Sequence, residues 1–254
     1  MPGAIDYAKG TIADLLQNKM DISMLVISKS LGKSADDADY ANKQAHVELA
    51  MRMKKRDPGN APNVGDRVAY VIVQAAKGVP AYEKSEDPVY VLENNLPIDT
   101  EYYLTNQLSN PLTRIFEPII SNPQSLLTGE HTRTVTKVTP TAKAGGIMMF
   151  AVKKEKCMGC KTLIAEKDIV KGRSGAPLCS NCVGRESDIY VSKLHDLNTH
   201  QNLFNKLWTE CQRCQGSFHQ DVICSNRDCP IFYKRKKVHI DLLSVQEALQ
   251  RFSW

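Results

Sequence analysis

Eight cysteines carry the clearest chemistry in this sequence. The chain has 254 residues, and every cysteine lies between Cys157 and Cys229, so that the first 156 residues contain none. A secreted disulfide framework would spread its cysteines through the fold that it cross-links. Clustered C-x-x-C pairs, in a chain whose first residues lack the layout of a secretory signal, instead predict metal ligation in a reducing compartment.

The first four cysteines have a spacing similar to that of a zinc ribbon. Cys157 and Cys160 form one C-x-x-C pair, and after eighteen residues Cys179 and Cys182 form a second. Each pair directs two thiolates at one ion, so two pairs complete a tetrahedron around Zn²⁺. Four cysteine ligands leave no open position, which predicts a structural zinc site, not a hydrolytic one. A thioredoxin-like redox pair or a set of reduced buried thiols is the alternative.

The last four cysteines, Cys211, Cys214, Cys224 and Cys229, predict a second site with a different spacing. Zinc and an iron–sulfur cluster both accept four thiolates, so the spacing does not choose between them. The Cys229-Pro230 step and the apolar residues nearby favour a cluster, yet the residues alone leave both open. His219 lies between the cysteines as a further candidate ligand, although four thiolates already suffice.

The elements expected before the cysteines mix helix and strand. Residues from Asp36 to Lys55 have a helical apolar pattern, and the run from Arg67 to Val73 is rich in the β-branched residues typical of a strand. A further helix is expected from Glu101 to Ile120, with Thr100 as its N-cap and a kink or break at Pro111.

Two apolar stripes at helical spacing flank the second group of cysteines. Each predicts an amphipathic helix that either packs within the chain or docks a partner subunit. The first stripe comprises Tyr190, Leu194, Leu197, Phe204 and Trp208, and the second comprises Leu242, Val245, Leu249 and Phe252.

These patterns predict an α+β protein with a mixed, mainly helical region at residues 1–130. A linker rich in Ser, Thr, Pro and Gly would follow at 131–150, and a small zinc-ribbon-like and helical metal-binding domain at 151–254. The net charge of +5 permits a nucleic-acid partner without requiring one. No run of eighteen apolar residues exists, so no membrane span is expected.

Several segments of the chain resemble a known family. The chain is similar to the C-terminal part of the polymerase delta catalytic subunits, a eukaryotic replicative branch of family B DNA polymerases. The resemblance covers essentially the whole chain and is weakest at 121–129 and 161–177. Its carrying segments are Asp21-Ile22-Ser23, Lys43-Gln44-Ala45-His46, Arg56-Asp57-Pro58-Gly59, Gly65-Asp66-Arg67-Val68, Leu96-Pro97-Ile98-Asp99-Thr100, Arg114-Ile115-Phe116-Glu117-Pro118, Cys211-Gln212-Arg213-Cys214 and Cys229-Pro230-Ile231-Phe232-Tyr233.

The resemblance implies functions for both regions. Residues 1–130 would form the polymerase thumb, which grips primer–template DNA behind the active site. The first cysteine module would bind zinc and help to engage the sliding clamp, and the second would hold a 4Fe–4S cluster and dock the accessory B-subunit. It also implies a nuclear protein. The candidate phosphate contacts are Lys29, Lys33, His46, Arg52, Lys54, Lys55, Arg56 and Arg67.

The resemblance also shows what the sequence lacks. Phosphoryl transfer needs carboxylates that hold two Mg²⁺ ions, and in the family these lie in palm segments such as Y-G-D-T-D, which this chain does not contain. The cluster Asp36-Asp37-x-Asp39 is better explained as the start of a helix. We therefore predict no catalytic residue here and no polymerisation by this segment alone. A non-enzymatic zinc-binding adapter is the alternative, and the role of the basic run 234–237 stays open.

Overall fold

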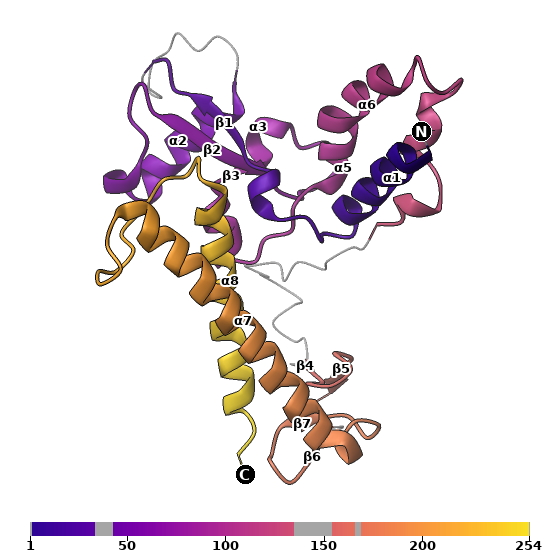
Figure 1. Cartoon of the computed structure of the whole chain (residues 1–254), viewed down its shortest axis with the longest axis vertical. Coiled ribbons are helices and arrows are strands. Elements are labelled where there is room, and N and C mark those ends of the chain that lie inside the picture. The colour runs from indigo at the N-terminus through magenta and orange to yellow at the C-terminus, as the bar shows by residue number, and fades with distance from the viewer. Residues whose placement is uncertain (1, 34–42, 135–153, 166–168, 254) are drawn as a thin grey trace. The chain divides into compact units, whose positions relative to one another are not determined.

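The computed structural model describes residues 2–33, 43–134, 154–165 and 169–253. By its contacts the chain divides into two compact units, one within Met1–Thr139 together with Asn226–Lys234, the other within Pro140–Ser225 together with Arg235–Trp254. Figure 1 shows that helices dominate and that the sheets are small. This composition, with its cluster of cysteines, confirms the predicted α+β class. The division at 130 and 150 stays a prediction, because most of 131–150 lies outside the described residues.

A three-stranded antiparallel sheet organises the first unit. Its strands are β1 (Ile27–Ser30), β2 (Arg67–Ile72) and β3 (Ser85–Glu86), with β2 in the centre. Every residue of β2 after Arg67 is buried, as expected of a strand that is covered on both faces. The β-branched run therefore predicts this strand correctly.

Helix α2 (Ala45–Arg56) packs against this sheet. The sequence pattern places the helix start near Asp36, but Gln44 is extended, so the described helix begins at Ala45. The residues 34–42 lie outside the described part, and with them the acidic cluster. Helix α2 ends close to Lys55, as predicted. The chain turns there, and the side chain of Asp57 accepts a hydrogen bond from the N–H of Gly59.

The single helix expected from Glu101 to Ile120 is divided. It consists of α5 (Thr100–Tyr102), a π-helical segment (Tyr103–Leu108) and α6 (Ser109–Phe116). Pro111, in the first turn of α6, has no N–H to donate to the carbonyl four residues earlier, and the wider π-helical segment ends three residues before it. The N-cap is Asp99, whose side chain accepts from the N–H of Tyr102, so the expectation that Thr100 caps the helix is wrong.

The remaining helices of the first unit are α1 (Pro2–Leu16), α3 (Ala81–Lys84) and α4 (Pro88–Glu93). Helix α1 was not expected from the sequence, yet Ile12, Leu15 and Leu16 are among the most buried residues of the core. Phe232 and Tyr233 join the same core. The segment 226–234 is therefore built into the first unit by its apolar side chains.

The second unit combines two small hairpins with two long helices. Strands β4 (Lys154–Lys156) and β5 (Leu163–Ala165) pair, as do β6 (Val170–Lys171) and β7 (Pro177–Leu178), each pair antiparallel. Helix α7 (Glu186–Gln215) follows the hairpins and ends at Gly216, which has the left-handed conformation that a glycine adopts easily. Helix α8 (Pro230–Gln250) belongs to this unit from Arg235 onward.

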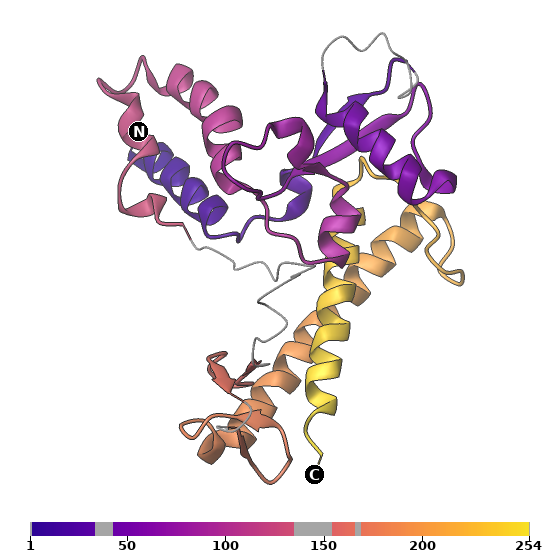
Figure 2. The same ribbon diagram turned by 180° about the vertical axis from the view of Figure 1, so that it is seen from behind.

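Helices α7 and α8 lie side by side in opposite directions within this unit, as both views show (Figures 1 and 2). Trp208 lies under the guanidinium of Arg235, and Phe204 stacks on His239 with ring centroids 5.4 Å apart. The apolar stripe predicted on α7 thus packs partly within the chain. No helix in the described ranges is long and apolar enough to cross a membrane.

Candidate metal centre

The first four cysteines come together at the start of α7. Cys157 directly follows β4, and Cys160 lies in the turn that leads into β5. Cys179 directly follows β7, and Cys182 precedes the short 3₁₀ turn that enters α7. The four sulfur atoms all lie within 4.8 Å of one another. The two hairpins therefore bring together the quartet that the spacing predicts.

The separations between these sulfurs match the edges of a zinc tetrahedron. The Sγ of Cys179 lies 3.7 Å from the Sγ of Cys157 and 3.7 Å from the Sγ of Cys160. With Zn–S bonds of about 2.3 Å, the edge of a regular tetrahedron is about 3.8 Å. None of the eight cysteines, all of which are described, forms a disulfide. Four thiol donors at this spacing fit Zn²⁺.

Hydrogen bonds prepare part of the quartet to act as thiolates. The contact between Cys160 and the hydroxyl of Thr162, 3.1 Å away, lowers the pKa of the Cys160 thiol to about 6. Burial raises the pKa of Cys157, but backbone N–H groups, including that of Cys179, more than offset it and lower that pKa. The role of Thr162 was missed from the sequence, although it stands two residues after a candidate ligand.

The fourth thiol shows why the quartet needs a cation. Its neighbours, with Cys179 first, raise the pKa of Cys182 to about 12, because a further negative charge beside other thiolates is unfavourable. A bound divalent cation offsets that repulsion, since zinc is coordinated by thiolates and its binding releases their protons. The four sulfurs are thus arranged for a cation.

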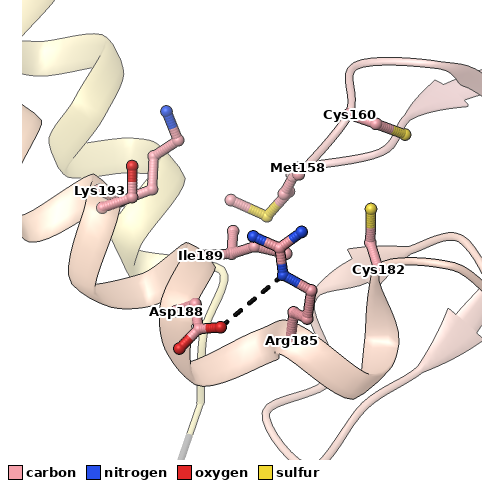
Figure 3. A pocket seen from close by; sticks show the side chains of 9 residues that line it. Met158, Cys160, Cys182, Arg185, Asp188, Ile189 and Lys193 are labelled. Atoms are coloured by element: carbon pink, nitrogen blue, oxygen red, sulfur yellow. Dashed lines mark ion pairs between the residues drawn. The ribbon is translucent and has the colours of Figure 1, made fainter.

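A tightly packed apolar base supports the quartet. Cys157 is 1% exposed and packs with Ile164 and Leu178. Gly159 is required by close approach, since a Cβ there would lie 2.9 Å from the Sγ of Cys182. Beside the two cysteine turns is a cavity of about 380 Å³. Figure 3 shows Cys160 and Cys182 at its edge.

The second group of cysteines lies far from the first. Cys211 and Cys214 are in the last turns of α7, one helical turn apart on one face, and not in a separate knuckle. Cys211 is twenty-five residues after Glu186, or roughly 38 Å along the helix axis, so it cannot share a metal with Cys182. This distance agrees with the predicted division of the cysteines in chain order.

The structure does not bring this second group together as closely. The sulfurs of Cys211, Cys214 and Cys224, all described, do not gather within the distance that encloses the first quartet. Cys229 packs against the core of the first unit. The donor set still suits zinc or a cluster by its chemistry, and its assembly into one site stays a prediction. His219 is exposed.

Side chains of α7 and α8 hold the loop that carries Cys224. The amide of Gln212 donates to the carbonyls of Phe218 and Gln220, both at 3.1 Å. Arg235 is 6% exposed and donates to the carbonyl of Cys224 at 3.1 Å. Within the basic run 234–237, this arginine therefore has a structural role.

Among the predicted DNA contacts, three arginines are bonded within the fold and the histidine is buried. Arg52 donates to the carbonyl and the hydroxyl of Ser85. Arg56 pairs with Glu86 at 2.6 Å and lies over the ring of Tyr90. The other two are His46, which is 5% exposed, and Arg67, which donates to the hydroxyl of Ser28 at 3.0 Å.

The four lysines of the predicted set are exposed. Lys29 is on β1, and Lys33 follows that strand. Lys54 and Lys55 are in the last turn of α2, where positive charge also favours the helix dipole. Their exposure suits phosphate contact, while the arginines nearby stabilise the unit that carries them.

Comparison with known proteins places these features in a wider context. Residues 1–119 match the family model described as DNA polymerase family B, and residues 157–235 match that described as the C4-type zinc-finger of DNA polymerase delta. Three DNA polymerase delta catalytic subunits are similar over 98–100% of this chain. The protein from Oryza sativa is 53% identical, that from Drosophila melanogaster 56% and that from Schizosaccharomyces pombe 54%. The chain spans 22% of the length of each.

Proposed function

We propose that this chain, which is similar to the DNA polymerase delta catalytic subunits over its whole length, belongs to their family and is the segment that grips the product duplex and carries the metal modules of a replicative DNA polymerase. The proposal has three parts: zinc in the first module, duplex contact by residues 1–130, and a 4Fe–4S cluster with partner docking at the second module.

Zinc binding rests on the quartet of Cys157, Cys160, Cys179 and Cys182, whose sulfurs are gathered within 4.8 Å. This is the observation that carries the proposed function. Zinc bound there would cross-link two hairpins that have few buried apolar residues of their own. The closed set of four thiolates supports a structural module, through which the segment would engage the sliding clamp.

Duplex binding rests on the match to family B polymerases and on the exposed lysines of the first unit. Lys54 and Lys55 are in the last turn of α2, which packs on the central sheet through buried side chains earlier in the helix. A thumb must move along DNA of any sequence, so it needs phosphate contacts and no readout of the bases. Basic side chains presented by a rigid helix meet that requirement.

Partner docking at the second module rests on chemistry and exposure. Thiols at Cys211, Cys214, Cys224 and Cys229 suit a 4Fe–4S cluster, and Ile223 beside them is 88% exposed. An exposed apolar side chain in a loop held by Gln212 and Arg235 suits contact with the accessory B-subunit. A subunit of a replicative polymerase would act in the nucleus. The Mg²⁺ carboxylates of nucleotide transfer would lie in other parts of the polymerase.

Metal and acid-labile sulfide analysis of oxygen-free protein tests the proposal. We expect one zinc ion per chain, together with four iron and four sulfide, and a brown colour from absorption near roughly 400 nm. A colourless protein with two zinc ions would refute the cluster and leave the first module intact. Protein without zinc would refute the function proposed for the first quartet.

A further inference from the structure

A single carboxylate holds the loop that precedes Cys179. Glu186, in the first turn of α7, accepts hydrogen bonds from the backbone N–H groups of Arg173 at 3.0 Å and Ser174 at 3.2 Å. It also accepts one from the hydroxyl of Ser174. Ser174 is fully buried and Glu186 is 7% exposed. The loop fits closely, because a Cβ on Gly172 would lie 2.5 Å from Oε1 of Glu186.

The same loop is held from its other side by residues that follow α8. The carbonyl of Ser174 accepts two hydrogen bonds from Ser253, one from its N–H at 2.9 Å and one from its hydroxyl at 2.8 Å. The ring of Phe252 packs edge-on against Tyr190 of α7, with centroids 5.4 Å apart. All these residues belong to the second unit.

Arg251 adds a third contact to the first module. Its guanidinium pairs at 2.6 Å with Glu155 of β4, the strand that leads into Cys157. Three successive residues, 251–253, therefore contact β4, α7 and the loop before β7. Each of these elements is directly connected to one of the cysteine pairs.

We propose that Glu186 and the segment 251–253 are positioning residues for the first zinc site. They hold the loop 172–176 so that Cys179, three residues later, meets the other thiolates. Strand β7, which follows this loop, is also tied to the first cysteine pair, because the N–H of Met158 donates to the carbonyl of Pro177 at 3.1 Å. The inference rests on the proposed zinc binding, since groups that orient ligands determine how firmly a metal is kept.

Position 186 requires a side chain with two hydrogen-bond acceptors. The Ser174 hydroxyl and the two backbone N–H groups lower the pKa of Glu186, so it is ionised at neutral pH and has acceptors on both oxygens. Glutamine has the same length but replaces one acceptor by an NH₂ group. That donor would face another donor in the loop, which leaves a buried N–H without a partner.

Zinc release from the full-length chain tests the proposal. Zinc-loaded protein is mixed with the chromogenic chelator 4-(2-pyridylazo)resorcinol, and the kinetic phase that disappears in Cys157→Ser is assigned to the first site. We expect Glu186→Gln to speed this phase about tenfold. Ser253→Ala, which keeps the backbone hydrogen bond, should speed it by a smaller factor. Glu247→Gln and Ser244→Ala, at exposed positions of α8, are the matched controls and should release zinc as the wild type does.

The outcomes separate this inference from the proposed function. If the wild type has no zinc that depends on Cys157, the proposed function fails before any variant is compared. If it holds zinc and both Glu186→Gln and Ser253→Ala release it at the wild-type rate, the positioning role is wrong. Circular dichroism monitors the helices; should Glu186→Gln fail to fold, the milder Ser253→Ala decides the question alone.

Discussion

Arg227 forms an ion pair with Asp87, from which it is separated by 140 residues in the sequence. Asp87 is 7% exposed, and burial raises its pKa, which the positive charge of Arg227 opposes. The pair therefore compensates a buried carboxylate and fastens the segment 226–234, which contains Cys229, to the first unit.

Replacing Arg227 by methionine should lower the free energy of unfolding of the first unit by about 1–3 kcal/mol at neutral pH, because Asp87 loses its partner. The penalty should shrink as pH falls toward the pKa of Asp87, since the protonated carboxyl no longer needs a positive charge. Hydrogen exchange of β2 and α4 amides, measured across this pH range, checks it. A penalty that stays constant with pH would contradict the account.

His46 should make the first unit sensitive to acid. Burial and the nearby charge of Lys29 lower its pKa below the ordinary value of 6.5, so folding favours the neutral ring. As pH falls below 6.5 the unfolded chain takes up the proton first, and stability is lost down to the lowered pKa. Hydrogen exchange in α2 should show this loss. His46→Leu should flatten the pH dependence, and His195→Gln, at an exposed position of α7, should leave it unchanged.

The lysines and arginines of α2 should separate DNA affinity from stability. Lys54→Gln with Lys55→Gln should weaken duplex binding equally for unrelated sequences and reduce the salt slope by about 0.9 for each phosphate that is no longer neutralised. Lys55→Gln alone, at an exposed position, should change the free energy of unfolding by less than about 0.5 kcal/mol. Fluorescence anisotropy at several salt concentrations measures the binding. A loss confined to one DNA sequence would argue against a thumb role.

Arg52→Gln is the matched comparison for those lysine variants. It removes one positive charge from the same helix, but Arg52 also donates to Ser85 of β3. Its main effect should therefore be on stability, by about 1 kcal/mol or more. Equal effects of Arg52→Gln and Lys55→Gln on DNA affinity and on stability would show that the division of roles is wrong.

Cys229→Ser should impair the second module and spare zinc at the first. We expect iron and B-subunit binding to fall while zinc at the first module is kept, because Cys211 and Cys214 of the second module lie at the end of α7 that is remote from the first quartet. Elemental analysis with a pull-down of the B-subunit measures both. Loss of zinc in this variant would mean that the cysteines do not pair in chain order.

The sequence predicts well what depends on local spacing. The first zinc quartet follows from two C-x-x-C pairs, and β2 follows from its β-branched run. Helix α7 follows from an apolar stripe, although its last turns also include Cys211 and Cys214. In each case the spacing of metal ligands or of apolar residues along the sequence directly determines the local structure.

What the sequence does not predict depends on partners that are distant along the chain. The sequence does not show that Arg52 and Arg56, two of the predicted DNA contacts, also bond to Ser85 and Glu86 within the fold. Neither the cap at Asp99 nor the π-helical segment before Pro111 is resolved by short-range preferences. The partner of Glu186 is likewise a loop that only the fold brings near it.

The two hydrogen bonds from Ser253 to the carbonyl of Ser174 also have a thermodynamic corollary. Coupling between two equilibria is reciprocal. If docking of Ser253 on the loop raises the affinity for zinc by some factor, zinc binding favours the docked state of Ser253 by the same factor. A probe attached beside Ser253 would therefore report whether the cysteine quartet holds zinc, although the probe contacts none of the ligands.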